Sequence, residues 1–140
     1  MVSFVLDSSV TLAWIYAEET TPAIQELLLR VKAKGAWVPS LWKLEVANIL
    51  EMGVRRQRYD RVIRDRTLAD LAQLAIRIDS ETDRRAWGAT LHLAEQYRLT
   101  LYDAAYLELA VRRALPLATL DLDLRQAAGR QGVVLLGGEA

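Results

Sequence analysis

The 140-residue sequence contains no cysteine, one histidine and three prolines. Without cysteine, disulfide bonds and thiolate metal sites are excluded. The single histidine, His92, leaves no basis for the Ser–His or Cys–His pairs of nucleophilic catalysis. No apolar stretch reaches the roughly 20 residues that a membrane-spanning helix needs. The N-terminal segment has no basic start followed by a long apolar run, so we expect no secretory signal and a cytoplasmic protein.

The sequence also lacks an excess of charge of either sign. It has 18 basic and 18 acidic residues and a formal net charge of zero, so no global positive field indicates a nucleic-acid partner. With 52% hydrophobic and 26% charged residues, the composition is typical of a globular protein. The length suits one compact domain, which we place at residues 1–136, followed by a flexible tail at 137–140.

The arginines are distributed unevenly along this neutral chain. Four of them lie close together at Arg55, Arg56, Arg58 and Arg61. A cluster of this kind is typical of a solvated helix end, and it is also a patch that can contact phosphates. We keep both interpretations open and treat the four arginines as candidate contacts to a nucleic acid.

Short apolar runs alternate with helical patterns along the whole chain. We expect strands at 2–6, 36–38, 75–78, 117–120 and 133–136. We expect helices at 9–16, 22–34, 40–53, 60–74, 80–97, 103–111 and 121–128. Pro22 in the first turn and Gly35 at the end mark the bounds of the second helix. The alternation predicts an α/β fold, a three-layer α/β/α sandwich with a mostly parallel central sheet, in which ligands bind beyond the carboxyl ends of the strands.

Four acidic residues occupy positions where such a fold binds ligands. Asp7 follows the first strand, Asp121 follows the strand at 117–120, and Asp103 begins the helix before that strand. Glu45 lies within a helix, and its neighbours three and four residues away are mostly large and apolar. An ionised carboxylate on that face needs a compensating partner, and a cation in a shared pocket would be one.

These acids have a chemical interpretation and an ordinary one. Carboxylates in one pocket repel each other unless a cation is present, and Mg²⁺ and Mn²⁺ prefer oxygen ligands. Such an ion can bind a phosphate and lower the pKa of an attacking water. Taken alone, however, Asp103 and Asp121 are also common helix caps, and Asp7 is a common turn residue. The hypothesis of a catalytic metal site depends on all four acids, Glu45 included, meeting at one end of the sheet.

Four segments of the sequence resemble those of the PIN-domain nucleases. They are Asp7-Ser8-Ser9-Val10, Glu45-Val46-Ala47-Asn48-Ile49-Leu50, Leu101-Tyr102-Asp103-Ala104-Ala105-Tyr106-Leu107-Glu108-Leu109-Ala110 and Leu117-Ala118-Thr119-Leu120-Asp121. In order and spacing they are similar to the VapC-type toxins of bacterial and archaeal toxin–antitoxin pairs, over nearly the whole chain. The resemblance implies a PIN fold and a Mg²⁺- or Mn²⁺-dependent endoribonuclease. It implies that Asp7 and Asp103 are the main metal ligands and that Glu45 and Asp121 complete the pocket.

The same resemblance implies supporting residues and partners. Ser9 and Thr119 fall on the hydroxyl positions of the family, and Asn48 would orient its neighbours by hydrogen bonds. Asp123 is an acid where relatives often carry a basic residue, so it either faces solvent or adds negative charge to the pocket. Relatives commonly form homodimers and are inhibited by a small cognate antitoxin. We therefore expect an RNA substrate, contacted by the arginine cluster, an antitoxin and a second copy of the chain as partners, and no membrane.

The large aromatic residues have two possible places. Trp14, Tyr16 and Trp42 have apolar bodies with polar tips, which suits a protein interface, but large aromatics more often belong to the core. We place Trp37 and Trp87 in the core.

Two other functions stay open at this point. A phosphoryl-acceptor or phosphatase-like domain also has acids at strand ends and binds magnesium. Against it, Asp7 is followed by Ser8 and Ser9 instead of forming an Asp-x-Asp pair, and no lysine follows the late strands. A non-catalytic protein-binding module, in which the acids are only caps, predicts no stabilisation by manganese.

Overall fold

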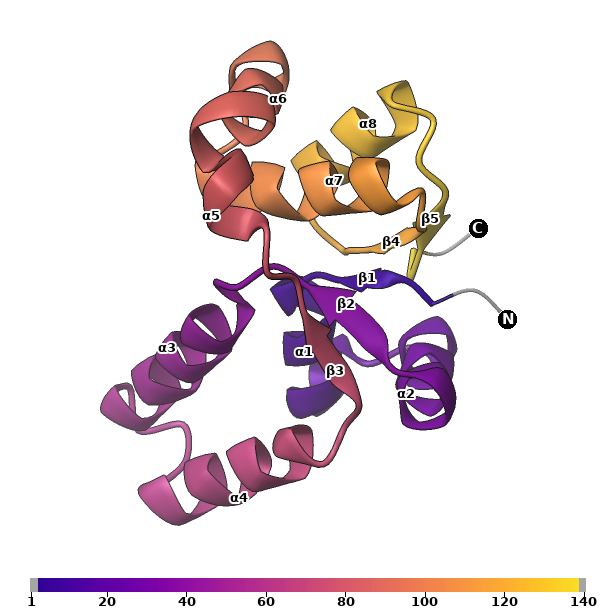
Figure 1. The fold of residues 1–140 in the computed structure, drawn as a ribbon. Helices are drawn as coiled ribbons and strands as arrows, with labels where there is room; N and C mark the ends of the chain where they lie inside the picture. The colour runs from indigo at the N-terminus through magenta and orange to yellow at the C-terminus, as the bar shows by residue number, and fades with distance from the viewer. Residues whose placement is uncertain (1–2, 139–140) are drawn as a thin grey trace.

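Five parallel strands form the central sheet in the computed structural model, which describes residues 3–138 (Figure 1). The strands are β1 (Val5–Leu6), β2 (Ala36–Val38), β3 (Ile76–Ile78), β4 (Leu117–Ala118) and β5 (Leu135–Leu136). Their order across the sheet is β3-β2-β1-β4-β5, and every neighbouring pair is parallel. In the register, Val5 of β1 lies opposite Trp37 on one side and Leu117 on the other.

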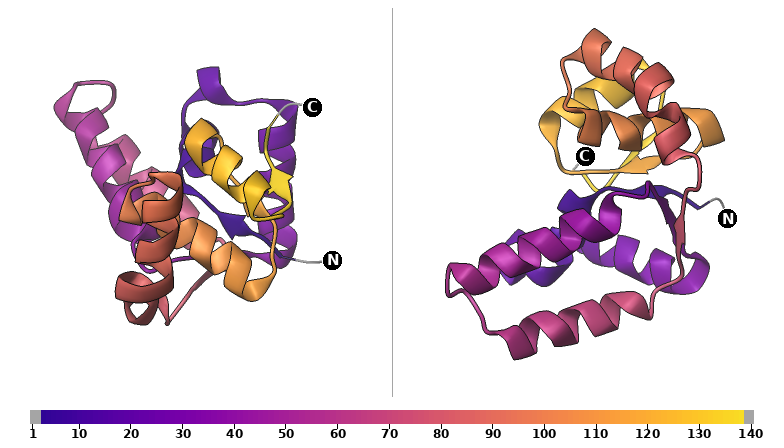
Figure 2. Two further views of the ribbon diagram at one scale, coloured as in Figure 1. Left: turned by 90° about the horizontal axis from the view of Figure 1, so that it is seen from above. Right: turned by 60° about the vertical axis from the view of Figure 1, so that its left-hand side comes forward.

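Helices cover both faces of the sheet, as Figures 1 and 2 show. One face carries α1 (Ser8–Ile15), α2 (Pro22–Lys34), α3 (Trp42–Arg55) and α4 (Arg61–Ala72). The other carries α5 (Thr82–Arg85), α6 (Leu91–Tyr97), α7 (Leu101–Arg113) and α8 (Leu122–Arg130). A 3₁₀ turn (Ala17–Glu19) follows α1, and a π-helical turn (Ala86–Thr90) joins α5 to α6. The predicted three-layer α/β/α sandwich with a parallel sheet is confirmed.

Local chemistry sets the bounds of α2 as predicted. The side chain of Thr21 accepts a hydrogen bond from the backbone N–H of Ile24, and Pro22 occupies the first turn. Gly35 ends the helix with φ = 77°. A Cβ atom there would lie 2.3 Å from the carbonyl oxygen of Ala75, so this position requires glycine both for its backbone conformation and for space.

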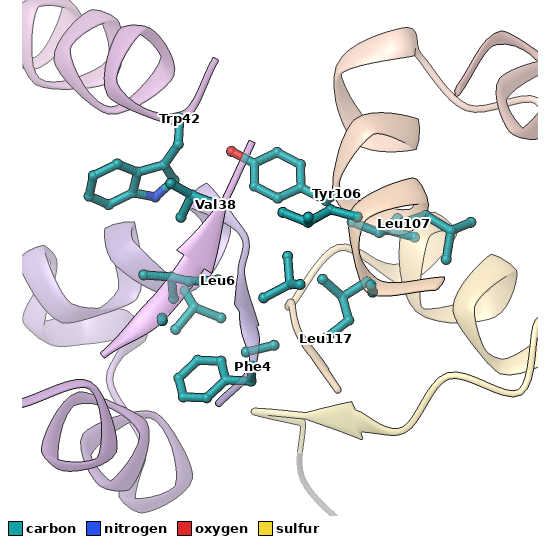
Figure 3. Close-up of a cluster of buried hydrophobic side chains, with 14 of the residues drawn as sticks. Phe4, Leu6, Val38, Trp42, Tyr106, Leu107 and Leu117 are labelled. Carbon is teal, nitrogen blue, oxygen red and sulfur yellow. The ribbon is translucent and has the colours of Figure 1, made fainter. Parts of the chain in front are cut away.

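The core lies on both faces of the sheet (Figure 3). Phe4, Leu6 and Trp42 pack between the sheet and the first four helices, whereas Leu107 and Leu117 pack on the side of α7. Every residue from 104 to 110 is buried, so α7 is surrounded by protein along most of its length. Because α7 packs against β1 and β4, this burial fixes the position of the helix that carries Asp103.

The expected helix at 80–97 is interrupted. At Gly88 the backbone has φ = −114° and ψ = −105°, outside the helical region, within the π-helical turn between α5 and α6. The prediction that Trp87 is a core residue is wrong, because its side chain is 92% exposed. Trp87 lies in a π-helical turn beside the non-helical Gly88, a geometry that the regular helix expected at 80–97 did not include. Trp42 is buried and Trp14 and Trp37 pack against the core, so the core interpretation is confirmed for Trp42.

The ends of the chain are described in part. β1 covers only two residues of the strand expected at 2–6, and residue 2 lies outside the described residues. Of the tail expected at 137–140, Gly137 and Gly138 are placed, whereas 139–140 are also outside. Within 3–138, no helix has the length and apolar character needed to cross a bilayer.

Candidate functional site

The strand order changes direction between β1 and β4. From β1 the chain continues to β2 and β3 on one side, whereas β4 and β5 lie on the other side of β1. In open α/β sheets this switch point is where ligands bind, beyond the carboxyl ends of the strands. The backbone N–H of Asp7, directly after β1, donates to the carbonyl oxygen of Ala118 at the end of β4, with N and O 3.0 Å apart. The segments that carry Asp7 and Asp121 therefore leave the sheet side by side.

Asp7 is buried at this switch point, 3% exposed, with two hydroxyl groups on one of its oxygens. The hydroxyl of Ser9 donates to Oδ2 over 2.6 Å and that of Thr119 over 2.8 Å. Ser9 Oγ in turn accepts from the N–H of Leu120, and Thr119 Oγ1 accepts from that of Asp121. Burial raises the pKa of Asp7, and the two hydroxyl groups oppose that rise. The structure thus places Ser9 and Thr119 where they hold the carboxylate.

Glu45 reaches the same region from α3 and is half-buried. The phenol of Tyr106, from α7, donates to Glu45 Oε1 over 2.5 Å. In Figure 3 the Tyr106 hydroxyl points toward Trp42 at the start of α3. Burial raises the pKa of Glu45, and the negative charges of Asp7 and Asp103 raise it further, whereas the Tyr106 hydrogen bond lowers it. The carboxylate therefore faces the other acids across the space between α3 and α7.

Sequence reasoning missed Tyr106 as a site residue. A signal was present, because a tyrosine within an apolar helical segment needs a partner for its hydroxyl when it is buried. Tyr106 also lies three residues after Asp103, on the same face of α7. Burial and the nearby charge of Glu45 raise the pKa of the phenol, which keeps it protonated and a hydrogen-bond donor.

Asp103 lies in the first turn of α7. The cap of this helix is Thr100, whose hydroxyl accepts from the N–H of Asp103. The pKa of Asp103 is raised from 3.8 to about 6, first by burial and then by the charges of Asp121 and Asp7. The charge of Asp123 adds to this rise. A carboxylate shifted in this way is surrounded by other carboxylates and has no cationic side chain among its main influences.

Asp121 and Asp123 come from the start of α8. Asp121 is the cap of α8 and accepts from the N–H of Leu124 over 2.9 Å. Its role as a cap is therefore real, and its charge also acts on Asp103. Asp123 is exposed and adds negative charge to the same region, so both interpretations left open for it apply.

The acids share one electrostatic environment, but they do not form a closed metal site. Within the part of the chain that the structure describes, no three Asp, Glu, His or Cys side chains are close enough together to hold an ion. The donor chemistry nevertheless fits a hard dication, because every group is a carboxylate oxygen. A cation would also relieve the repulsion that raises the pKa values of Glu45 and Asp103.

Asn48 does not have the orienting hydrogen bond that the resemblance implied. It is exposed on α3, three residues after Glu45, and it forms no hydrogen bond with another residue in 3–138.

The four candidate arginines lie away from the acids. Arg55 is the last residue of α3, ten residues after Glu45, which is about 15 Å along the helix axis. Arg55 pairs with Glu51 and Arg58 with Glu18. All four arginines are exposed, at Arg55, Arg56, Arg58 and Arg61, between the end of α3 and the start of α4. They form a charged tip of the α3–α4 hairpin (Figure 2).

A buried ion network, also unpredicted, joins the end of β3 to α7. Arg112 contacts Asp79 over 2.6 Å and Glu108 over 2.8 Å. Burial raises the pKa of Asp79, but Arg112 and Arg113 outweigh it and hold the pKa below its usual value. With each carboxylate paired, this network differs from the unpaired acids beside Asp7, and we assign it a structural role.

Comparison with solved structures supports the fold. A crystal structure of a protein from Pyrobaculum aerophilum matches with 24% identity and a TM-score of 0.68, over 96% of this chain and 90% of that chain. A toxin–antitoxin complex from Klebsiella pneumoniae matches with 20% identity and a TM-score of 0.64, over 94% and 96%. VapBC2 from Rickettsia felis, bound to a DNA fragment from their promoter, matches with 12% identity and a TM-score of 0.64, over 97% and 98%.

Sequence comparison is specific at the level of the family. No curated protein matches the chain. The model of the PIN domain family matches residues 4–130. This match includes β1 to β4 and all four candidate acids, whereas β5 lies outside it. The chain belongs to the PIN domain family.

Proposed function

We propose that the protein is an endoribonuclease that cuts RNA with Mg²⁺ or Mn²⁺ bound by Asp7, Glu45, Asp103 and Asp121. The observation that carries this proposal is that Asp7, buried at the end of β1, and acids from α3, α7 and α8 lie close enough for their charges to act on one another. Acids that repel one another across separate elements cost stability, and a bound dication offsets that cost. Membership of a nuclease family supports the same conclusion.

The residues of the chain have distinct roles in this proposal. Ser9 and Thr119 hold the carboxylate of Asp7 through hydrogen bonds to its Oδ2 atom. Tyr106 orients Glu45 toward the other acids. Asp103 and Asp121 approach from the starts of α7 and α8, on the face of the sheet opposite to α3. When bound, the ion supplies a phosphate contact and lowers the pKa of the attacking water.

We further propose that the protein is the toxin of a toxin–antitoxin pair. Two of the similar structures are a toxin–antitoxin complex and VapBC2, at low identity. A mostly apolar cavity of about 710 Å³ lies between α1, α2 and α4, and Trp14 and Tyr16 line it. In this proposal a small antitoxin binds at the cavity, and Trp14 and Tyr16 belong to that protein interface. A second copy of the chain is also a proposed partner, and the cytoplasm is the proposed compartment.

A cleavage assay on total RNA tests the nuclease proposal. Wild-type protein with Mn²⁺ is expected to cut, and EDTA or Asp103→Asn is expected to abolish cutting. Asp70→Asn is the matched control, because Asp70 is an exposed acid on α4. Equal cleavage by wild type and Asp103→Asn would contradict the assignment of Asp103 to the metal site. Mapping the cut ends would identify the RNA.

The two alternative functions make different predictions. A phosphoryl acceptor needs an accessible nucleophilic oxygen, but Asp7 is 3% exposed and one of its oxygens already accepts two hydroxyl groups. Labelling of Asp7 by radioactive acetyl phosphate would support that function. A non-catalytic module predicts that Mn²⁺ leaves the unfolding temperature unchanged, whereas a metal bound by the folded state raises it.

A further inference from the structure

One exposed aromatic residue directly precedes Asp103 and has no hydrogen-bond or ring partner among residues 3–138. Tyr102 is 64% exposed in the first turn of α7, next to Asp103. Among residues 3–138 its hydroxyl forms no hydrogen bond, and its ring is in no aromatic pair. The other tyrosine of α7, Tyr106, is buried and bound to Glu45. Tyr102 therefore contributes nothing visible to the core or to the orientation of the acids.

The position of Tyr102 follows from the geometry of α7. Residues 102 and 106 share a helix face, four residues and about 6 Å apart along the axis. Tyr106 reaches the Glu45 carboxylate from this face, so Tyr102 lies one turn closer to the start of α7, where the helix is exposed to solvent. A second exposed apolar side chain, Leu122, directly follows Asp121 and is 76% exposed.

Before a metal ion is bound, electrostatics gives an RNA strand little affinity for the start of α7. The acids beside it are negative, the net charge of the chain is zero, and the four clustered arginines are at the far end of α3. Stacking of a base on an aromatic ring does not depend on charge and contributes roughly 1–3 kcal/mol per base. Bases in a duplex are already stacked on each other, so only an unpaired nucleotide can use such a ring.

We propose that Tyr102 is a substrate-binding residue whose ring stacks on an unpaired base next to the scissile phosphate. This inference rests on the proposed nuclease function. Leu122, exposed directly after Asp121, is a second candidate contact to the neighbouring sugar or base.

Three variants separate stacking from other effects. Tyr102→Phe keeps the ring and loses the hydroxyl, Tyr102→Leu keeps an apolar side chain and loses the ring, and Tyr102→Ala loses both. On a mixed-sequence single-stranded RNA with Mn²⁺, we expect Tyr102→Ala to raise KM about 5- to 150-fold, which corresponds to the stacking contribution. The kcat should change little. Tyr102→Phe should behave as wild type and Tyr102→Leu as Tyr102→Ala, and duplex RNA should be a poor substrate for wild type.

Binding measured without cleavage distinguishes failure of this inference from failure of the proposed function. In the Asp103→Asn background, fluorescence anisotropy with a labelled single-stranded oligonucleotide should show the same order of variants. A single abasic nucleotide beside the cut should weaken binding when Tyr102 is present and have no further effect in Tyr102→Ala. The rise in unfolding temperature with Mn²⁺ should be equal in all Tyr102 variants.

Three results would overturn the role of Tyr102. They are an unchanged KM and affinity in Tyr102→Ala, equal behaviour of Tyr102→Leu and Tyr102→Phe, or abasic and Tyr102→Ala penalties that simply add. Absence of cleavage by wild type would instead overturn the proposed function, and the anisotropy measurements would still decide whether the ring binds an unpaired base.

Discussion

Neutralising one acid of the site should stabilise the metal-free protein. Asp103→Asn keeps the size of the side chain and removes its charge. Burial and the charges of Asp121 and Asp7 raise the pKa of Asp103 from 3.8 to about 6. At 1.36 kcal/mol per pKa unit this difference sets a ceiling of about 3 kcal/mol on the cost of the ionised form. Because Asp103 is partly open to solvent, screening reduces the expected gain to roughly 1–2 kcal/mol.

The gain in the free energy of unfolding from Asp103→Asn should depend on pH in a defined direction. Between pH 3.8 and about 6 the folded protein still holds the Asp103 proton, whereas the unfolded chain has lost it. The free energy of unfolding of wild type therefore falls as pH rises through this window. The advantage of Asp103→Asn should be complete at pH 7.5 and fall to about a third of that value at pH 4.5.

Thermal unfolding in EDTA, followed by circular dichroism, measures this effect. For a domain of this size the gain corresponds to a rise in Tm of roughly 3–8 °C at pH 7.5. Asp70→Asn, on the exposed surface of α4, should change stability by less than about 0.5 kcal/mol. A lower Tm for Asp103→Asn at pH 7.5, or an identical gain at both pH values, would refute the argument that burial and the neighbouring acids disfavour the ionised form of Asp103.

Three further substitutions test contacts that support the site and the fold. Thr119→Val removes a hydroxyl that donates to the buried Asp7 carboxylate. It should lower the free energy of unfolding in urea by about 1–3 kcal/mol, and an unchanged free energy would show that the bond is unimportant. Arg112→Met leaves Asp79 buried without its main partner. It should lower the free energy of unfolding by about 3–5 kcal/mol, and an unchanged urea midpoint would contradict this. Gly35→Ala should lower the urea midpoint, since φ is +77° and a Cβ would clash with a carbonyl oxygen; wild-type stability would contradict this.

The parts of the site that follow from local patterns were predictable from the sequence. Asp7 directly follows a short apolar strand, and Asp121 follows another, so their approach at one sheet edge required only the parallel α/β pattern. The bounds of α2 also depend on neighbouring residues alone. The helix expected to begin at Asp103 begins two residues earlier, at Leu101, with Thr100 as its cap.

The contacts between distant segments were not predictable in this way. Tyr106 and Glu45 are 61 residues apart, and Arg112 and Asp79 are 33 apart, so no local spacing indicates either pair. The expectation of one regular helix at 80–97 also failed at Gly88. The π-helical turn around Gly88 shifts the faces of the helix, and a tryptophan expected in the core is exposed there.

Crystals grown with Mn²⁺ and measured at the manganese absorption edge test most directly whether the four acids share a dication. We predict an anomalous peak at the β1–β4 switch point in contact with Asp7 and Asp103, with Glu45 and Asp121 facing it directly or through water. Absence of a peak at saturating Mn²⁺, or a Glu45 carboxylate turned away from Asp7, would contradict the proposed metal site.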